Sequence, residues 1–198
     1  MNAKLLRVAW FSILLGIAME LLLLLAAAGF GTIPAFKPVI ADLVQKVSWS
    51  LFVCVGLAFG TVLSQNNPPV MGLSGLVSGP VAFNIARMLH KGSLQALSVA
   101  VPAAAGPSPF LLALIKAAEY GLLGVAAGWV NKASKGPGVC ALLALFIGAF
   151  FGGITLWFVA QASANPLTAS AWVARSINEI LFPVGCSLVL YTAGVSKR

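Results

Sequence analysis

Apolar runs of membrane length recur along this chain and constrain its fold more than any other feature. A helix needs about 20 apolar residues to cross the hydrocarbon core of a bilayer. Of the 198 residues, 60% are hydrophobic and only 8% are charged. This composition does not indicate a soluble domain in addition to the membrane spans. The sequence therefore predicts an all-α, polytopic integral membrane bundle that forms a single transmembrane domain, 1–198. The predicted spans are residues 8–30, 46–63, 70–89, 110–130, 139–162 and 170–194.

Two connections between the predicted spans are long, and prolines interrupt both of them. They are residues 31–45 and 91–109. The apolar part of the second, near 92–105, is too short to cross a bilayer, so we expect an additional interfacial or re-entrant segment there. The alternative is that this stretch lengthens the third span. If the bundle encloses a pocket that is open to the outer side, we expect both long connections to cover it as lids.

The basic residues predict how the chain is oriented. Lysine and arginine favour the cytoplasmic side of a membrane, and they are more numerous on one side if both termini lie in the cytoplasm. The inner side then has Lys4, Arg7, Lys132, Lys135, Lys197 and Arg198, and the outer side has Lys37, Lys46 and Lys91. We expect a multi-pass protein of the bacterial inner (plasma) membrane, with a net charge of +8 that reflects orientation signals and not a nucleic-acid partner.

The first apolar run has features of a secretory signal, because basic residues precede it and it ends in alanines. It is too long for the apolar region of a signal peptide, and it contains Glu20. We therefore expect it to be a retained span.

Ionisable and polar side chains within the predicted spans gather at one depth. Arg175, Asn178 and Glu179 share one face of the last span, because they are three and four residues apart. An ionisable group at membrane depth costs about 3 kcal/mol and almost always faces a bundle interior or a wet cavity. In the predicted orientation most of these groups lie in the outer half of the bundle. The candidate substrate-binding residues are Glu20, Asn84, Arg87, Lys116, Glu119, Arg175, Asn178 and Glu179.

Two interpretations of this layer are open. In the first, it forms a solute pocket in which arginine and lysine hold carboxylate or phosphate oxygens, and glutamate and asparagine accept from amines or hydroxyls. Trp49 and Trp172 would then stack on a ligand ring, although an interfacial aromatic belt explains them as well. In the second, the ions only hold the helices in register, through the pairs Lys116–Glu119 and Arg175–Glu179.

The two interpretations correspond to two functions. A pocket indicates a protein that binds a small polar or zwitterionic solute, as a transporter or the substrate-binding subunit of one. Ion pairs that only hold the helices in register indicate an accessory or scaffold subunit of a larger membrane complex.

Catalytic, metal and cofactor chemistry is not indicated. Gly72, Ser74 and Gly75 match the G-x-S-G pattern of rhomboid-type intramembrane proteases. A Ser/His dyad needs its base on a neighbouring helix, whereas the single histidine, His90, follows on the same segment. The three cysteines stand alone and form no metal-binding motif. We expect no enzymatic activity and no cofactor.

Paired glycines predict where the helices approach one another closely. Small residues four apart let helix backbones come into contact inside a membrane. We expect these pairs to pack within the chain, with docking against another subunit as the alternative. The pairs are Gly56/Gly60, Gly75/Gly79, Gly124/Gly128 and Gly148/Gly152.

The layout resembles the membrane-embedded substrate-binding S component of energy-coupling factor (ECF) vitamin transporters. The run 119–129, EYGLLGVAAGW, with the basic turn and the glycine-rich fifth span after it, is similar to what such proteins show. The resemblance implies an outer pocket, lid-like loops and partner subunits that include a coupling/ATPase module. It implies that Lys116, Glu119, Arg175, Asn178 and Glu179 face the pocket. Residues 8–25 lack the Ala-x-x-x-Ala docking surface of that family, and Ser12-x-x-x-Gly16 is the nearest substitute.

Overall fold

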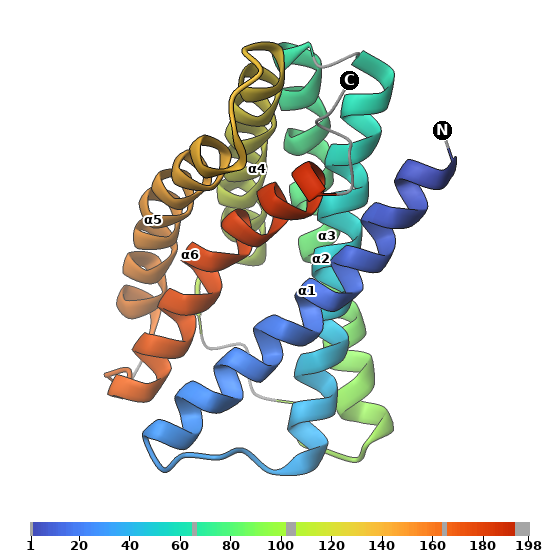
Figure 1. The fold of residues 1–198 in the computed structure, drawn as a ribbon. Coiled ribbons are helices and arrows are strands. Elements are labelled where there is room, and N and C mark those ends of the chain that lie inside the picture. Colours follow the sequence, from blue (N-terminus) through green and yellow to red (C-terminus); the bar gives the residue numbers. More distant parts are fainter. Residues whose placement is uncertain (1, 65–66, 102–105, 164–165, 193–198) are drawn as a thin grey trace.

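Six α-helices make up the described part of the chain. The computed structural model describes residues 2–64, 67–101, 106–163 and 166–192, and within these ranges it has no strand (Figure 1). All six helices are long and apolar enough to cross a membrane, which confirms the predicted all-α membrane bundle. The helices are α1 (Asn2–Gly29), α2 (Phe36–Ser64), α3 (Pro68–Ala96), α4 (Pro109–Lys132), α5 (Pro137–Ala162) and α6 (Ala169–Thr192).

Local sequence signals define several helix ends. Proline occupies the first turn of α3, α4 and α5, where its missing N–H would have no helical partner in any case. At the other end, a serine with left-handed backbone lies two residues beyond the last helical residue of α3 and of α4: Ser98 (φ 54°) and Ser134 (φ 50°). The next amide in each case donates back into the last turn, Val99 N to Leu94 O at 2.9 Å and Lys135 N to Val130 O at 3.0 Å. Both helices therefore end in the same αL cap.

Two helices are longer than the apolar runs that predicted them. Helix α2 begins at Phe36, not at residue 46, and α3 continues to Ala96. The predicted lid over 31–45 is therefore wrong, because most of it is helical. Residues 92–96 belong to α3, as expected if this stretch lengthens the third span. Residues 97–101 contain no helix, and residues 102–105 lie outside the described residues. Hydropathy marks only the part of a helix that sits in hydrocarbon, whereas helical hydrogen bonds continue into polar sequence.

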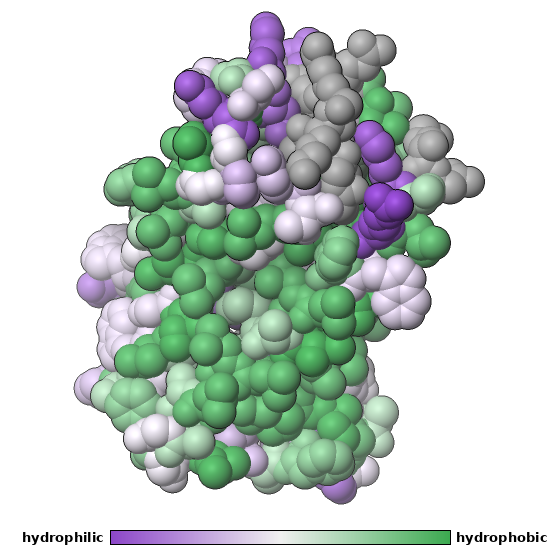
Figure 2. Space-filling model, in the orientation of Figure 1, coloured by the Kyte–Doolittle hydropathy of each residue, from purple (hydrophilic) through white to green (hydrophobic). Residues whose placement is uncertain are grey.

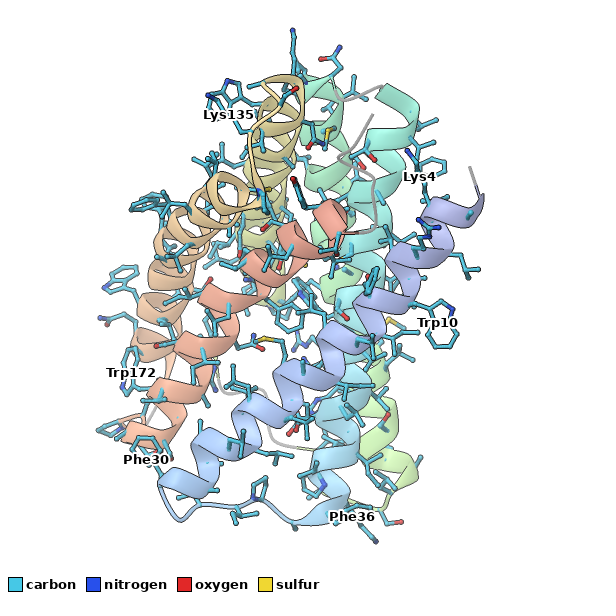
Figure 3. The ribbon with its side chains drawn as sticks, viewed as in Figure 1. Lys4, Trp10, Phe30, Phe36, Lys135 and Trp172 are labelled. Atoms are coloured by element: carbon cyan, nitrogen blue, oxygen red, sulfur yellow. The ribbon has the colours of Figure 1, made fainter. Side chains whose placement is uncertain are left out.

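The helices form a closed ring. Each helix contacts the next along the chain and α6 contacts α1, while α2, α4 and α6 also meet across the interior. Helix α1 begins and α6 ends at the same end of the bundle (Figure 1). Lys4 and Lys135 lie at that end too, and Phe30 and Phe36 lie at the opposite end (Figure 3). Helices α2, α4 and α6 therefore all begin at the end marked by the two phenylalanines.

The outer surface is apolar over a broad band. Figure 2 shows hydrophobic residues across the middle of the visible face and hydrophilic residues gathered at the end where α1 begins. Trp10 and Trp172 point away from the bundle (Figure 3), and Trp10 is 62% exposed. Apolar side chains on the outside of long helices suit a lipid environment, so the fold is that of an integral membrane protein.

The paired glycines pack inside the chain, as predicted, and bring α3 and α4 together. A Cβ at Gly75 would collide with the carbonyl oxygen of Tyr120, and a Cβ at Gly79 would lie 2.5 Å from the carbonyl oxygen of Lys116. Gly124 meets α3 in the same way. The two backbones are therefore in direct contact, which fixes the height of Lys116 on α4.

The other glycine pairs join α2 to α3 and α5 to α6. Gly56 and Gly60 face Ser78 and Ser74, and Ser74 Oγ donates to the carbonyl oxygen of Gly56 at 2.5 Å. Gly148 faces the backbone of Ile180, and Gly152 faces Glu179. Close packing on these sides leaves the remaining space of the bundle between α2, α3, α4 and α6.

Candidate functional site

A small cavity lies where α2, α3, α4 and α6 surround the interior. Its volume is about 110 Å³, and we call it the inner cavity. Lys46 lies ten residues after Phe36, Lys116 seven after Pro109 and Glu179 ten after Ala169, which places all three roughly 10–15 Å below the helix starts. The lining residues are Gln45, Lys46, Trp49, Phe83, Ala86, Lys116, Tyr120, Asn178, Glu179 and Phe182.

Lys116 is the centre of the ionic network in this cavity. Its Nζ atom donates to Glu119 Oε2 at 2.6 Å and to Glu179 Oε2 at 2.5 Å. The Glu119 side chain is fully buried, and the lysine is 8% exposed. The charged groups thus link α4 to α6 in a place where an isolated lysine would be strongly destabilising.

Aromatic rings form one wall of the inner cavity. The Trp49 ring lies edge-on to Tyr120, with centroids 5.6 Å apart, and to Phe83 at 6.3 Å. Lys116 Nζ lies 5.8 Å from the Trp49 ring centroid, within cation–π range. Trp49 therefore belongs to the site, whereas Trp172 points away from the bundle (Figure 3).

A second ion pair supports the cavity from the side of α1. Lys46 Nζ lies 3.7 Å from Glu20 Oε2, and both side chains are largely buried. The prediction that Lys46 marks the outer end of its span is wrong, because α2 begins ten residues earlier, at Phe36. Its ammonium is an interior group of the bundle.

A larger cavity adjoins the first on the side where α4 and α6 begin. It has a volume of about 450 Å³, and we call it the outer cavity. The two cavities share Gln45 and Phe83 as lining residues. Four basic side chains line the outer cavity, and none of its described lining residues is acidic. The basic residues are Arg87, His90, Lys91 and Arg175.

One of these basic residues has an acidic partner on α2. His90 Nε2 lies 3.1 Å from Asp42 Oδ1, with side chains that are 25% and 39% exposed. Among the described residues, neither Arg87 nor Arg175 takes part in an ion pair. The outer cavity therefore presents guanidinium groups without carboxylate partners.

Several buried acceptor atoms near the inner cavity have no hydrogen-bond partner among the described residues. They include Glu119 Oε1, Asn178 Oδ1 and Glu20 Oε2. Carboxylate and amide oxygens only accept, so each of these atoms requires a donor. An unsatisfied buried acceptor costs about 1–3 kcal/mol, and a ligand with N–H or O–H groups would satisfy Asn178 Oδ1, whose residue lines the inner cavity.

The structure brings together seven of the eight sequence-predicted residues. Lys116, Asn178 and Glu179 line the inner cavity, and Glu119 lies behind Lys116. Glu20 supports Lys46 from α1. The remaining two of the seven, Arg87 and Arg175, line the outer cavity. That these residues bind a solute stays a prediction.

Two details of the prediction are wrong. Asn84 lines neither cavity; it is exposed, and its Nδ2 donates to the carbonyl oxygen of Pro80 at 2.9 Å. Glu179 does not pair with Arg175, because Lys116 of α4 lies within 2.5 Å of its carboxylate. Spacing of four along one helix shows that two side chains can meet, but the fold supplied a closer partner from another helix.

Sequence reasoning missed Gln45, Lys46, Phe83 and Tyr120 as site residues. A signal was present in α2, because positions 42, 45, 46 and 49 share one helical face. This face was hidden because residues up to 45 were interpreted as a loop.

No group of three or more metal-ligating side chains occurs among the described residues. No protein family, curated protein or solved structure matches this chain. The chemistry of the two cavities therefore carries the functional argument.

Proposed function

We propose that this protein captures a small polar or zwitterionic solute from the outer side of a bacterial inner membrane, as a transporter or as its membrane-embedded substrate-binding subunit. The proposal rests on one observation. A charged inner cavity adjoins a larger, basic outer cavity at one end of the bundle, and both lie between membrane-length helices. With both termini in the cytoplasm, that end faces outward.

Binding accounts for features that helix registration does not require. Ion pairs that only pin helices need neither a cavity beside them nor unpaired charges. Here the buried atoms Glu119 Oε1 and Asn178 Oδ1 lack donors, and Arg175, which is exposed, lines the outer cavity without an acidic partner among the described residues. Buried polar groups without partners cluster at functional sites, because stability alone selects against them.

The resemblance to the S components of ECF transporters fits this proposal in its layout. Six spans and a cavity in one half of the bundle are expected for such a subunit. A partner coupling/ATPase module would then supply the energy for transport.

A second candidate is an accessory subunit of a larger membrane complex. The bridge from Lys116 to both Glu119 and Glu179 favours it, because a fully paired lysine between α4 and α6 stabilises their packing without any ligand. In that case the unpaired arginines would contact a neighbouring subunit.

Native mass spectrometry of the gently extracted protein tests the proposal. We expect a small molecule to be retained by the wild type and lost, by about tenfold or more, from Glu179→Gln. Lys116 keeps Glu119 as its partner in this variant, so folding should survive. Asn84→Ala is the matched control, because Asn84 lines neither cavity, and it should retain the small molecule. A fixed stoichiometry with other membrane subunits and no small molecule would instead support the accessory role.

A further inference from the structure

We infer that the solute is elongated and bipolar, with its anionic group held in the outer cavity at Arg87 and Arg175 and its amine or other donor end held in the inner cavity at Asn178 and Glu179. This inference rests on the proposed function, and it adds the chemical class and the orientation of the solute. A carboxylate, phosphate or sulfonate could each serve as the anionic group.

The inner cavity requires donors. Asn178 Oδ1 in the lining and Glu119 Oε1 behind it are acceptors without partners among the described residues, and the unpartnered Tyr120 hydroxyl in the lining can both donate and accept. The two ammonium groups that line this cavity already face carboxylates, Lys116 at 2.5–2.6 Å and Lys46 at 3.7 Å. An anion placed here would compete with three glutamates, whereas an amine would supply the missing hydrogen bonds.

The outer cavity requires an acceptor. Arg87 and Arg175 present planar guanidinium groups that suit bidentate binding of carboxylate or phosphate oxygens. Helix α4 starts beside this cavity, and its N-cap residue, Ser108, makes no side-chain capping hydrogen bond. The amides of the first turn and the helix dipole therefore add positive potential where the arginines already lie.

The two regions lie at different heights along α3 and α6, which favours a solute with separated ends. Arg175 and Glu179 are separated by one helical turn on α6, as are Arg87 and Phe83 on α3, which is roughly 6 Å of rise. The ammonium nitrogen and carboxyl carbon of an α-amino acid are only about 2.5 Å apart. A molecule with several atoms between its charged ends matches this rise better than a compact α-amino acid does.

A defined series of probes tests this inference on the purified full-length protein in nanodiscs. The probes are 6-aminohexanoate, glycine, hexanoate and hexylamine, with binding measured by equilibrium dialysis and by the thermal unfolding midpoint. We expect 6-aminohexanoate to bind with about tenfold or more higher affinity than each of the other three. Glycine has both charges without the length, and the other two have the length with one charge.

Two variants assign the ends of the probe. Arg175→Gln should weaken 6-aminohexanoate and hexanoate and leave hexylamine unchanged. Asn178→Leu should weaken 6-aminohexanoate and hexylamine and leave hexanoate unchanged. Asn84→Ala should change none of the affinities.

Three results would overturn the inference: equal binding of hexanoate or hexylamine and 6-aminohexanoate, a normal 6-aminohexanoate affinity in Arg175→Gln, or no binding of any probe. The proposed function would still stand in each case if native mass spectrometry found a retained solute that Glu179→Gln releases. Absence of any retained solute would remove both.

Discussion

Basic side chains line both the inner and the outer cavity, but they are paired with carboxylates to different degrees. In the inner cavity the lysines face carboxylates, at distances of 2.5–3.7 Å. In the outer cavity, 450 Å³ in volume, two arginines have no acidic partner among the described residues, and the histidine pair is partly exposed. The cost of an unpaired charge grows as water is removed. Charges in the inner cavity must therefore be compensated by the protein itself, whereas those in the outer cavity can remain available to a ligand.

This comparison predicts that the effect of breaking an ion pair depends on its depth. Lys116→Met should produce the largest effect, a destabilisation of about 3–5 kcal/mol, because it leaves two buried carboxylates without their cation. The free energy of unfolding can be measured by titration with SDS in mixed micelles. Lys132→Met, at the exposed end of the same helix, is the matched control and should stay within about 0.5 kcal/mol of the wild type.

A triple variant separates charge from packing at the same site. Adding Glu119→Gln and Glu179→Gln to Lys116→Met should restore most of the lost stability, because no unpaired charge then remains buried. If the triple variant were as unstable as Lys116→Met alone, lost packing and not charge would explain the effect.

Gly79→Ala should have an intermediate effect without changing any charge. The new Cβ would lie 2.5 Å from the carbonyl oxygen of Lys116, so α4 must move away from α3 at the level of the ionic network. We expect a destabilisation of about 1–3 kcal/mol in the same titration. Gly92→Ala on the same helix meets nothing within 4 Å, and it should be neutral or slightly stabilising because alanine favours helix. Similar results for both variants would argue against backbone contact between α3 and α4.

Asp42→Asn should have the smallest effect. Its pair with His90 is 25–39% exposed at the side chains, and exposed pairs contribute about 0–1 kcal/mol and are screened by salt. The unfolding free energy should therefore change by less than about 1 kcal/mol. A loss as large as that of Lys116→Met would show that depth does not govern these pairs.

Length and apolarity of the helices were readable from the sequence alone, because both follow from the thickness of a bilayer. Six runs of membrane length predicted six spans. The glycine pairs were equally readable, because only residues without large side chains permit backbone contact. At Gly75 and Gly79 this contact is with Tyr120 and Lys116 of the neighbouring helix.

The depth of the candidate residues in the membrane could also be predicted. Five of the eight line the two adjoining cavities, and Glu20 and Glu119 pair with lysines that line the inner one. The prediction failed for Asn84, because depth does not say which face of a helix points inward. It also left Lys46 at a helix end, because the hydropathy of residues 36–45 concealed the first turns of α2.

Only the tertiary structure decided which charged side chains pair with one another. The sequence places Arg175 four residues from Glu179, and local spacing makes them a plausible pair. In the fold, α4 is in backbone contact with α3 at Gly79, and Lys116 Nζ lies 2.5 Å from the Glu179 carboxylate of α6. Ion pairs follow distance in space, and distance between helices depends on which small residues let two backbones touch. The sequence thus determined which charges enter the membrane, while packing of the helices decided which of them are neutralised and which remain open to a ligand.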